Sequence, residues 1–384
     1  MHWPAFWKKF CGPSLATLIL AYLVSRAVFE RTGFDFRIFW VAGRLWANGI
    51  SPYDASFLNE YVRWFGAGPN THFWVYPPYW LPIVVPLSYL PFEAADKLWA
   101  FLNIALLIAA TWLTARAMQL SFALALLVAL PMQATFVAVA LGQTSLIVLF
   151  GFALALRGTQ KRDGSAAIIG ALIFTALKPN IGLFLFIYFI AERRYREVAV
   201  AGAFLLLLAL PSLATAGPSD WLGFLNALQA YSAPRYAVSQ PPDLTGIVQL
   251  ISLLVPTYDG SLICLAGMAL AAAVLGLVRH EFSSQMRLAG LVAAICLLVP
   301  LHSYDTTLCM IPLTLLAAIG HRIVVFISMA LLFRPTILAQ ITQVANPNTN
   351  HFIDSLIVSL TLSVIAISWL IAAHRSMNSP IRTQ

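Results

Sequence analysis

Long apolar runs, separated by short polar or basic segments, recur along the whole chain. Each run holds roughly 20 residues, which is the length that an α-helix needs to cross the hydrocarbon core of a bilayer. The chain has 384 residues, of which 60% are hydrophobic and only 10% are charged, whereas an average soluble domain has about 25% charged residues. The pattern predicts an all-α polytopic membrane protein with one integral membrane domain over residues 1–384. A large soluble helical protein would need far more polar surface.

Short basic clusters between the apolar runs predict the topology. Lys and Arg in short loops favour the cytoplasmic side of a membrane, so two neighbouring clusters must be separated by an even number of crossings. This rule leads to about twelve spans with both termini inside. The clusters lie at 8–9, 116, 157–164, 192–197, 279–281, 321–322 and 374–375.

The net charge of +8 does not indicate a nucleic-acid partner. The basic residues lie in these separate clusters, where they orient helices, and they do not form one basic stripe. Cys11, Cys264, Cys296 and Cys309 lie in or beside apolar segments without CxxC spacing, which is typical of small core residues. No group of His, Asp and Glu has the spacing of metal ligands. We therefore expect no metal and no cofactor.

Residues 73–91 are apolar but are not expected to form a regular span. Proline removes a backbone donor and clashes with the preceding helical turn. A crossing here would also place Arg116 on the wrong side of the membrane. We interpret the segment as broken, re-entrant or surface-lying, within a long outer-face loop over residues 30–96. The segment contains Pro77, Pro78, Pro82, Pro86 and Pro91.

Two parts of this loop have the pattern of interfacial helices. Residues 36–48 place aromatic and small residues on one face, which would lie toward lipid or core, and place Arg37 and Arg44 on another side. Residues 55–65 are a candidate for a second such helix. Asp35 lies just before the first helix, among aromatic residues. A carboxylate near lipid costs free energy, so Asp35 is either a solvated helix cap or part of a working site.

Several motifs, taken in order, resemble those of glycosyltransferase family 87. They are "DFRIFWVAGRLWANGISPYD", "YPPYWLPIVVPLSYLP", "LGQTSLIVLFGFALAL", "LKPNIGLFLFIYFIAERRYR" and "HSYD". The family comprises GT-C-type membrane enzymes related to polyprenyl-phosphate-mannose-dependent mannosyltransferases. The resemblance implies a GT-C-like helix bundle in a bacterial inner or plasma membrane, with an active site facing outward. It also implies transfer of a hexose, with mannose as the first candidate, from a polyprenyl-phosphate donor to a lipid or glycan acceptor.

The resemblance implies that Asp35 is the general base, because a weak hydroxyl nucleophile reacts faster when a carboxylate takes its proton. The donor phosphate leaves as an anion and needs cations, for which Lys178, Arg37 and Arg44 are candidates. The alternatives are a snorkelling lysine and two arginines that only anchor an interfacial helix. Direct displacement assisted by one base inverts the anomeric configuration and needs no metal.

Other outer turns carry candidates for binding the substrates. His302 and Asp305 lie in "HSYD", where two spans meet the outer face, and Gln143 lies in "LGQTS". Such groups can orient sugar hydroxyls, and a histidine can also steady a phosphate. Tyr76 is a candidate for the lining of the same pocket. The alternatives are a polar helix cap at Asp305 and an ordinary interfacial tyrosine at Tyr76.

Three other functions fit parts of the pattern. A lipid-linked glycan polymerase or ligase, or a flippase, would share the aromatic outer surface. A secondary transporter would also have about twelve spans and broken helices, but it should carry charges within its spans. Here the acidic residues favour helix ends and loops. The expected partners are therefore the donor, the acceptor and membrane lipids, and no nucleic acid.

Overall fold

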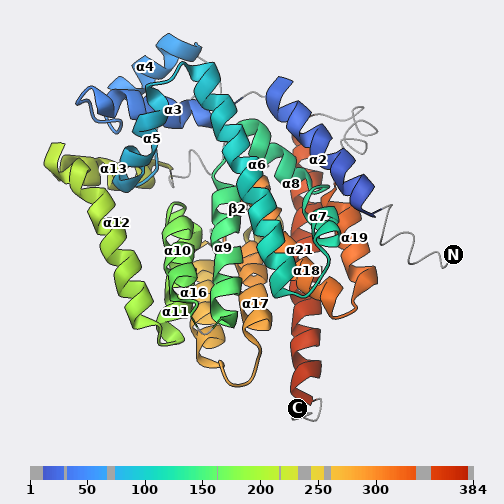
Figure 1. Cartoon of the computed structure of the whole chain (residues 1–384). Coiled ribbons are helices and arrows are strands. Elements are labelled where there is room, and N and C mark those ends of the chain that lie inside the picture. The colour runs from blue at the N-terminus through green and yellow to red at the C-terminus, as the bar shows by residue number, and fades with distance from the viewer. Residues whose placement is uncertain are drawn as a thin grey trace.

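The computed structural model describes residues 12–29, 33–66, 74–161, 163–215, 218–231, 244–254, 261–333 and 347–378. Within these ranges the chain is almost entirely helical (Figure 1). The strands found there are β1 (Leu244–Thr245) and β2 (Leu301–His302), which pair antiparallel. The all-α fold predicted from the apolar runs is confirmed.

The first part of the chain forms one long helix and a group of short ones. Figure 1 shows α3, α4 and α5 gathered at one end of the molecule, beside the upper end of α6. The elements are α2 (Gly12–Phe29), α3 (Phe36–Ala47), α4 (Ser56–Phe65), the 3₁₀ helix η2 (Pro78–Trp80), α5 (Leu81–Ser88) and α6 (Phe92–Ala117).

The middle of the chain builds the bundle below that group. The helix α9 packs against both α6 and α10, and α10 also contacts α11 and α12 (Figure 1). The helices are α7 (Phe122–Ala129), α8 (Gln133–Leu141), α9 (Ser145–Gln160), α10 (Ser165–Ala176), α11 (Pro179–Ala191) and α12 (Tyr195–Thr215).

The last part completes the bundle. The helix α17 packs between α16 and the long α21, and a 3₁₀ helix, η4 (Ser303–Cys309), contacts both α8 and α9. The helices are α13 (Ser219–Tyr231), α15 (Ile247–Leu254), α16 (Ser261–Leu277), α17 (Ser284–Leu298), α18 (Met310–Ala318), α19 (Arg322–Leu332) and α21 (Pro347–Asn378).

Three helices among the described residues are long and apolar enough to cross a membrane: Phe92–Ala117, Tyr195–Ala214 and Leu356–Ser376. The pair α7 and α8 passes the same test together but is bent by 73°. The other apolar helices in these ranges have 10–17 residues, so even the longest of them rises only about 25 Å, against about 30 Å for the hydrocarbon core. The structure therefore has helices suited to crossing a membrane but does not establish the predicted number of about twelve.

The predicted local elements of the first loop are present. The helices α3 and α4 match the segments 36–48 and 55–65. The proline-rich segment is broken as expected, into η2 and the eight-residue α5. The helix α13 was not among the predicted elements.

The aromatic face of α3 packs into protein, not lipid. Phe39 lies at the centre, with its ring centroid 5.7 Å from that of Trp74, 5.5 Å from Trp80 and 5.8 Å from Trp99. These side chains are almost completely buried, and burying an aromatic side chain of this size stabilises the fold by about 2–3 kcal/mol. This aromatic cluster fixes α3, and thereby its first residues, against the bundle.

Candidate functional site

The backbone before α3 is attached to the end of α8. The amide of Gly33 donates to the carbonyl of Ala140 (3.1 Å), and the amide of Asp35 donates to the carbonyl of Leu141 (2.9 Å). The last carbonyls of a helix have no partner within the helix, so the loop supplies the donors that α8 lacks. These bonds hold Asp35 beside the α8–α9 turn.

Gly33 is required at this junction for two reasons. Its φ of +54° is in the left-handed region, where a residue with a Cβ is strained. A Cβ at this position would also lie 2.3 Å from Oδ1 of Asp96, whose side chain is buried in α6. Gly33 therefore lets the chain approach α6 closely enough to reach α8.

Gln143 follows Gly142, which ends α8 in a left-handed conformation. The indole of Trp99 donates to the carbonyl of Gly142 (2.8 Å) and stabilises the turn. The side-chain amide of Gln143 donates to Oδ2 of Asp35. Asp35 occupies the N-cap position of α3, but its side chain makes no capping hydrogen bond. The carboxylate is therefore directed toward Gln143 and not toward the amides of its own helix.

The pKa of the Asp35 carboxyl is raised from its ordinary value of 3.8 to about 6. Burial raises it, because a charged carboxylate loses hydration, whereas the hydrogen bond from Gln143 and the charge of Lys178 lower it. A carboxyl with this pKa is mostly ionised at neutral pH and can still hold a proton. The guanidinium of Arg37 lies against the rings of Phe34 and Phe65.

Lys178 and Asp305 form a buried ion pair. The ammonium of Lys178, at the N-cap of α11, lies 2.5 Å from Oδ1 of Asp305 in η4. Ser145 donates its hydroxyl to the same oxygen (2.6 Å). Lys178 and Asp305 expose only 8% and 1% of their surface. A charge buried to this degree needs a partner of opposite charge. The pair brings the turns before α11 and α18 to the Asp35 carboxylate, whose pKa Lys178 lowers.

Tyr304 and His302 extend the cluster. The Lys178 ammonium lies 4.9 Å from the centre of the Tyr304 ring, in the range of a cation–π interaction. The rings of His302 and Tyr304 stack with centroids 5.1 Å apart. His302 is held in β2, opposite Leu244 of β1. We call the set Asp35, Gln143, Lys178, Tyr304 and Asp305 the polar cluster, with His302 at its edge.

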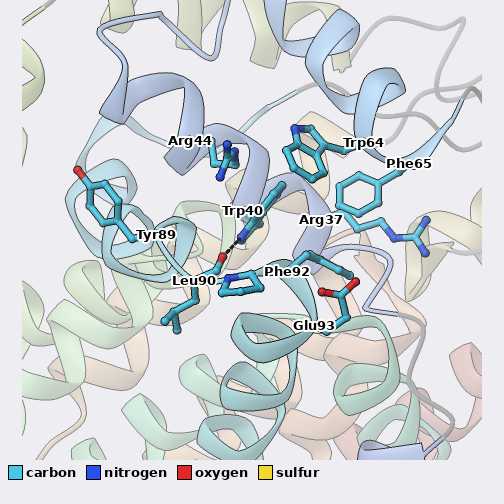
Figure 2. A pocket seen from close by; sticks show the side chains of 10 residues that line it. Arg37, Trp40, Arg44, Trp64, Phe65, Tyr89, Leu90, Phe92 and Glu93 are labelled. Atoms are coloured by element: carbon cyan, nitrogen blue, oxygen red, sulfur yellow. Dashed lines mark hydrogen bonds between the residues drawn. The ribbon is translucent and has the colours of Figure 1, made fainter.

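Arg37 and Arg44 lie apart from Lys178, in a cleft of about 580 Å³ between α3, α4 and the turn from α5 to α6 (Figure 2). The guanidinium of Arg44 lies 4.7 Å from the centre of the Trp40 ring and 4.9 Å from that of Trp64. The three cations predicted for one phosphate thus fall into two groups. Their role in phosphate binding stays a prediction.

Tyr76 belongs to the aromatic cluster beneath α3. Its ring lies 4.7 Å from Phe39 and 5.1 Å from Trp74, measured between centroids. Its carbonyl accepts a hydrogen bond from the hydroxyl of Tyr53 (2.5 Å). These contacts place Tyr76 in the packing that supports α3, and they leave its predicted part in substrate binding untested.

The comparison with known families decides the class of the protein. The sequence profile of glycosyltransferase family 87 matches residues 74–303. The chain belongs to this family. No curated protein and no solved structure matches the chain. A family 87 glycosyltransferase requires a sugar donor and an acceptor, so the polar cluster and the cleft are both candidates for holding them.

The region matched by the family contains Gln143, Lys178 and His302, whereas Asp305 lies just beyond its end and Asp35 lies well before its start. The structure nevertheless joins these two acids to Gln143 and Lys178 inside one cluster. Within the described ranges no group of three or more His, Cys, Asp or Glu side chains could hold a metal ion.

Two members of the site were not singled out from the sequence. Ser145 and Tyr304 lie within the motifs "LGQTS" and "HSYD", so the motifs located them, but neither residue type indicated a contact with an ion pair. Ser145 begins α9, and Tyr304 lies in η4. Both positions follow from tertiary contacts between the ends of helices, which are not visible in a linear pattern.

Proposed function

We propose that the chain is a GT-C-type enzyme that transfers a hexose, with mannose as the first candidate, from a polyprenyl phosphate to a hydroxyl of a lipid or glycan acceptor on the outer face of the membrane. The observation that carries the proposal is the Asp35 carboxylate, which accepts from Gln143 and has a pKa of about 6. Such a group is charged at neutral pH and able to take a proton, as a general base must be.

In the proposed reaction, an acceptor oxygen attacks the anomeric carbon of the donor sugar. The bond between that carbon and the phosphate oxygen breaks, and its electron pair stays on the phosphate. The acceptor proton passes to Asp35. Because one base assists a direct displacement, the anomeric configuration is inverted. The roles assigned to the chain need no metal.

Lys178 is the cation that we assign to the donor phosphate. Its ammonium has three N–H donors, and Asp305 takes one of them at 2.5 Å. Ser145 and Asp305 thereby fix the ammonium within electrostatic reach of Asp35. A phosphate placed at the remaining donors would lie next to the base, as the displacement requires.

Two buried oxygens of the polar cluster suit sugar hydroxyls. Oδ2 of Asp305 and Oε1 of Gln143 accept no hydrogen bond from any part of the chain that the structure describes. Buried polar atoms normally have partners, and the hydroxyls of a hexose are donors. The stacking of His302 on Tyr304, at the edge of the cluster, supports a contact of His302 with the phosphate or the sugar.

The test is a panel of sugar donors offered to the purified protein in lipid nanodiscs. Polyprenyl-phosphate hexoses should be consumed in the presence of a glycolipid extract, and nucleotide sugars should not be. Turnover of a nucleotide sugar, without any polyprenyl phosphate present, would overturn the proposed donor class. Failure of every lipid-phosphate sugar under conditions in which the protein remains folded would overturn the proposed function itself.

A further inference from the structure

The cleft that contains Arg37 and Arg44 has a rigid floor. Trp40, which is buried, donates its indole N–H to the carbonyl of Leu90 (3.1 Å), a bond drawn in Figure 2. This bond joins α3 to the turn before α6. The two arginines are seven residues apart on α3 and are therefore separated by about 10 Å along the helix axis. A rigid wall with two cations at this spacing can receive a ligand with more than one polar group.

Arg44 has no carboxylate partner among the described residues. Its guanidinium lies against two tryptophan rings, and its hydrogen bond to the carbonyl of Ser88 is long, at 3.5 Å. Aromatic stacking orients a guanidinium but leaves its edge N–H groups able to bind an anion. Phosphate and carboxylate groups match this edge with two parallel hydrogen bonds.

The rim of the cleft presents aromatic and acidic groups to solvent. The side chains of Trp64 and Tyr89 are 46% and 74% exposed, and Glu93 is also exposed. An exposed aromatic face offers a platform for the apolar face of a pyranose ring, and a carboxylate accepts hydrogen bonds from sugar hydroxyls. Together with the two arginines, these groups fit a saccharide that carries an anionic group.

The cleft lies next to the start of α3, because Arg37, which lines it, is two residues from Asp35 at the N-cap of that helix. Its Arg37 end lies beside Tyr61, which is buried in α4. Burial raises the pKa of the Tyr61 hydroxyl, a hydrogen bond from Arg37 and its charge lower it, and the charge of Asp35 raises it. Tyr61 is thus near both residues. Lys178 is the cation that acts on Asp35 itself, because its charge lowers the pKa of that carboxyl.

We propose that this cleft binds the anionic sugar headgroup of the acceptor, with its phosphate or carboxylate at Arg44, another polar group toward Arg37 and a sugar ring against Trp64 and Tyr89. The identification of this ligand as the acceptor rests on the proposed function. A headgroup held there presents a further hydroxyl to Asp35, while the donor phosphate is held at Lys178. The enzyme then favours acceptors that are both glycosylated and anionic.

The test measures binding and needs no turnover. Glucose 1-phosphate, glucose and inorganic phosphate are each titrated into the full chain in nanodiscs and followed by saturation-transfer or phosphorus NMR. We expect glucose 1-phosphate to bind more tightly than either glucose or phosphate. Arg44→Gln should weaken it roughly tenfold or more, the scale of a charge-assisted bidentate contact, and Arg44→Lys should weaken it less.

Two further variants separate the cleft from its alternatives. Arg63→Gln removes an equal charge from an exposed position of α4 and should leave the affinity unchanged. The double variant Lys178→Gln with Asp305→Asn, which removes both charges of the buried pair, should also leave the cleft-bound signal in place. Loss of binding in this double variant but not in Arg44→Gln would overturn the inference, because the probe would then report the donor site. Equal affinity for phosphate and for glucose 1-phosphate would overturn the assignment of a saccharide.

The outcome can be separated from that of the proposed function. If lipid-phosphate sugars are not consumed but glucose 1-phosphate binds through Arg44, the proposed reaction fails and the cleft remains a sugar-phosphate site. If transfer occurs and Arg44→Gln raises the KM for the acceptor roughly tenfold, without a change in the KM for the donor, the proposed function and the acceptor site are both supported. Transfer with an unchanged acceptor KM in Arg44→Gln would contradict the inference alone.

Discussion

The side-chain amide of Gln143 donates a hydrogen bond to the carboxylate of Asp35, across 108 residues of sequence. The contact joins the start of α3 to the turn between α8 and α9. It turns the carboxylate away from the amides of α3, which it could otherwise cap. It also counteracts the effect of burial on the pKa of that carboxyl. The pair therefore sets both the direction and the protonation of the proposed base.

Gln143→Ala should shift the pH dependence of transfer. A base must be deprotonated, so kcat/KM of the unmodified enzyme should rise with pH around a midpoint of about 6. Removing a hydrogen bond that lowers the pKa of Asp35 raises that pKa. The acid limb of the profile should therefore move to higher pH. Gln285→Ala, at the start of α17, is the control and should leave the acid limb unchanged. An unchanged acid limb in Gln143→Ala would contradict the role of the pair.

The charge of Asp35 should destabilise the fold, whereas the charge of a capping carboxylate would stabilise it. Its pKa is higher in the folded chain than its ordinary value, so the folded state binds the proton more tightly. The contribution of Asp35 to the free energy of unfolding therefore falls as pH rises from about 4 to about 6. Above that range its contribution stays constant and destabilising.

Asp35→Asn, which carries no charge, should therefore be more stable than the unmodified protein at pH 7.5. For a half-buried group the gain should be about 1 kcal/mol, and it should vanish near pH 4. Thermal unfolding of both proteins at the two pH values measures the difference. A lower stability of Asp35→Asn at pH 7.5 would instead indicate that the charge of Asp35 stabilises the fold.

Lys178→Gln should destabilise the protein by about 3–5 kcal/mol, because it leaves the carboxylate of Asp305 buried without its cation. The double variant Lys178→Gln with Asp305→Asn removes both charges and should recover most of that stability. Transfer should remain low in the double variant, because no ammonium is left for the donor phosphate. Recovery of transfer along with stability would show that the pair is only structural.

Gly33→Ala should reduce both stability and transfer. The substitution combines a strained φ of +54° with a Cβ that meets the carboxylate of Asp96, and each effect costs about 1–2 kcal/mol. Gly49 provides a matched control, since its φ is +74° but a Cβ there would meet nothing within 4 Å. Gly49→Ala should lose stability through strain alone and keep its transfer rate. Equal losses of transfer in the two variants would argue against a positioning role for Gly33.

The elements near the site could be predicted where the signal was local. Helical periodicity located α3 and α4, and proline located the break before α6. Pro131 carried the same kind of signal for the bend of 73° between α7 and α8, which was not used. The helix α13 has no long apolar run, so it did not stand out from its loop.

The pairings within the site were beyond the reach of local patterns. The sequence singled out Lys178 and Asp305 separately, but the contact between them spans 127 residues and depends on how the ends of several helices meet. The same holds for the separation of Arg44 from Lys178. Both were candidates as cations near the outer face, and only the packing of α3 against α5 shows that they face different surroundings.

The central claim is that Asp35 takes the proton of the acceptor, and the turnover of Asp35→Asn at saturating donor and acceptor tests it most directly. Asn keeps the shape of the side chain, can accept from Gln143 and caps a helix about as well as Asp. The account predicts a folded protein that binds the donor but whose transfer rate is lower by roughly a hundredfold or more. Asp54→Asn, at an exposed position of the same loop, should transfer at the normal rate. Near-normal transfer by Asp35→Asn would contradict the account.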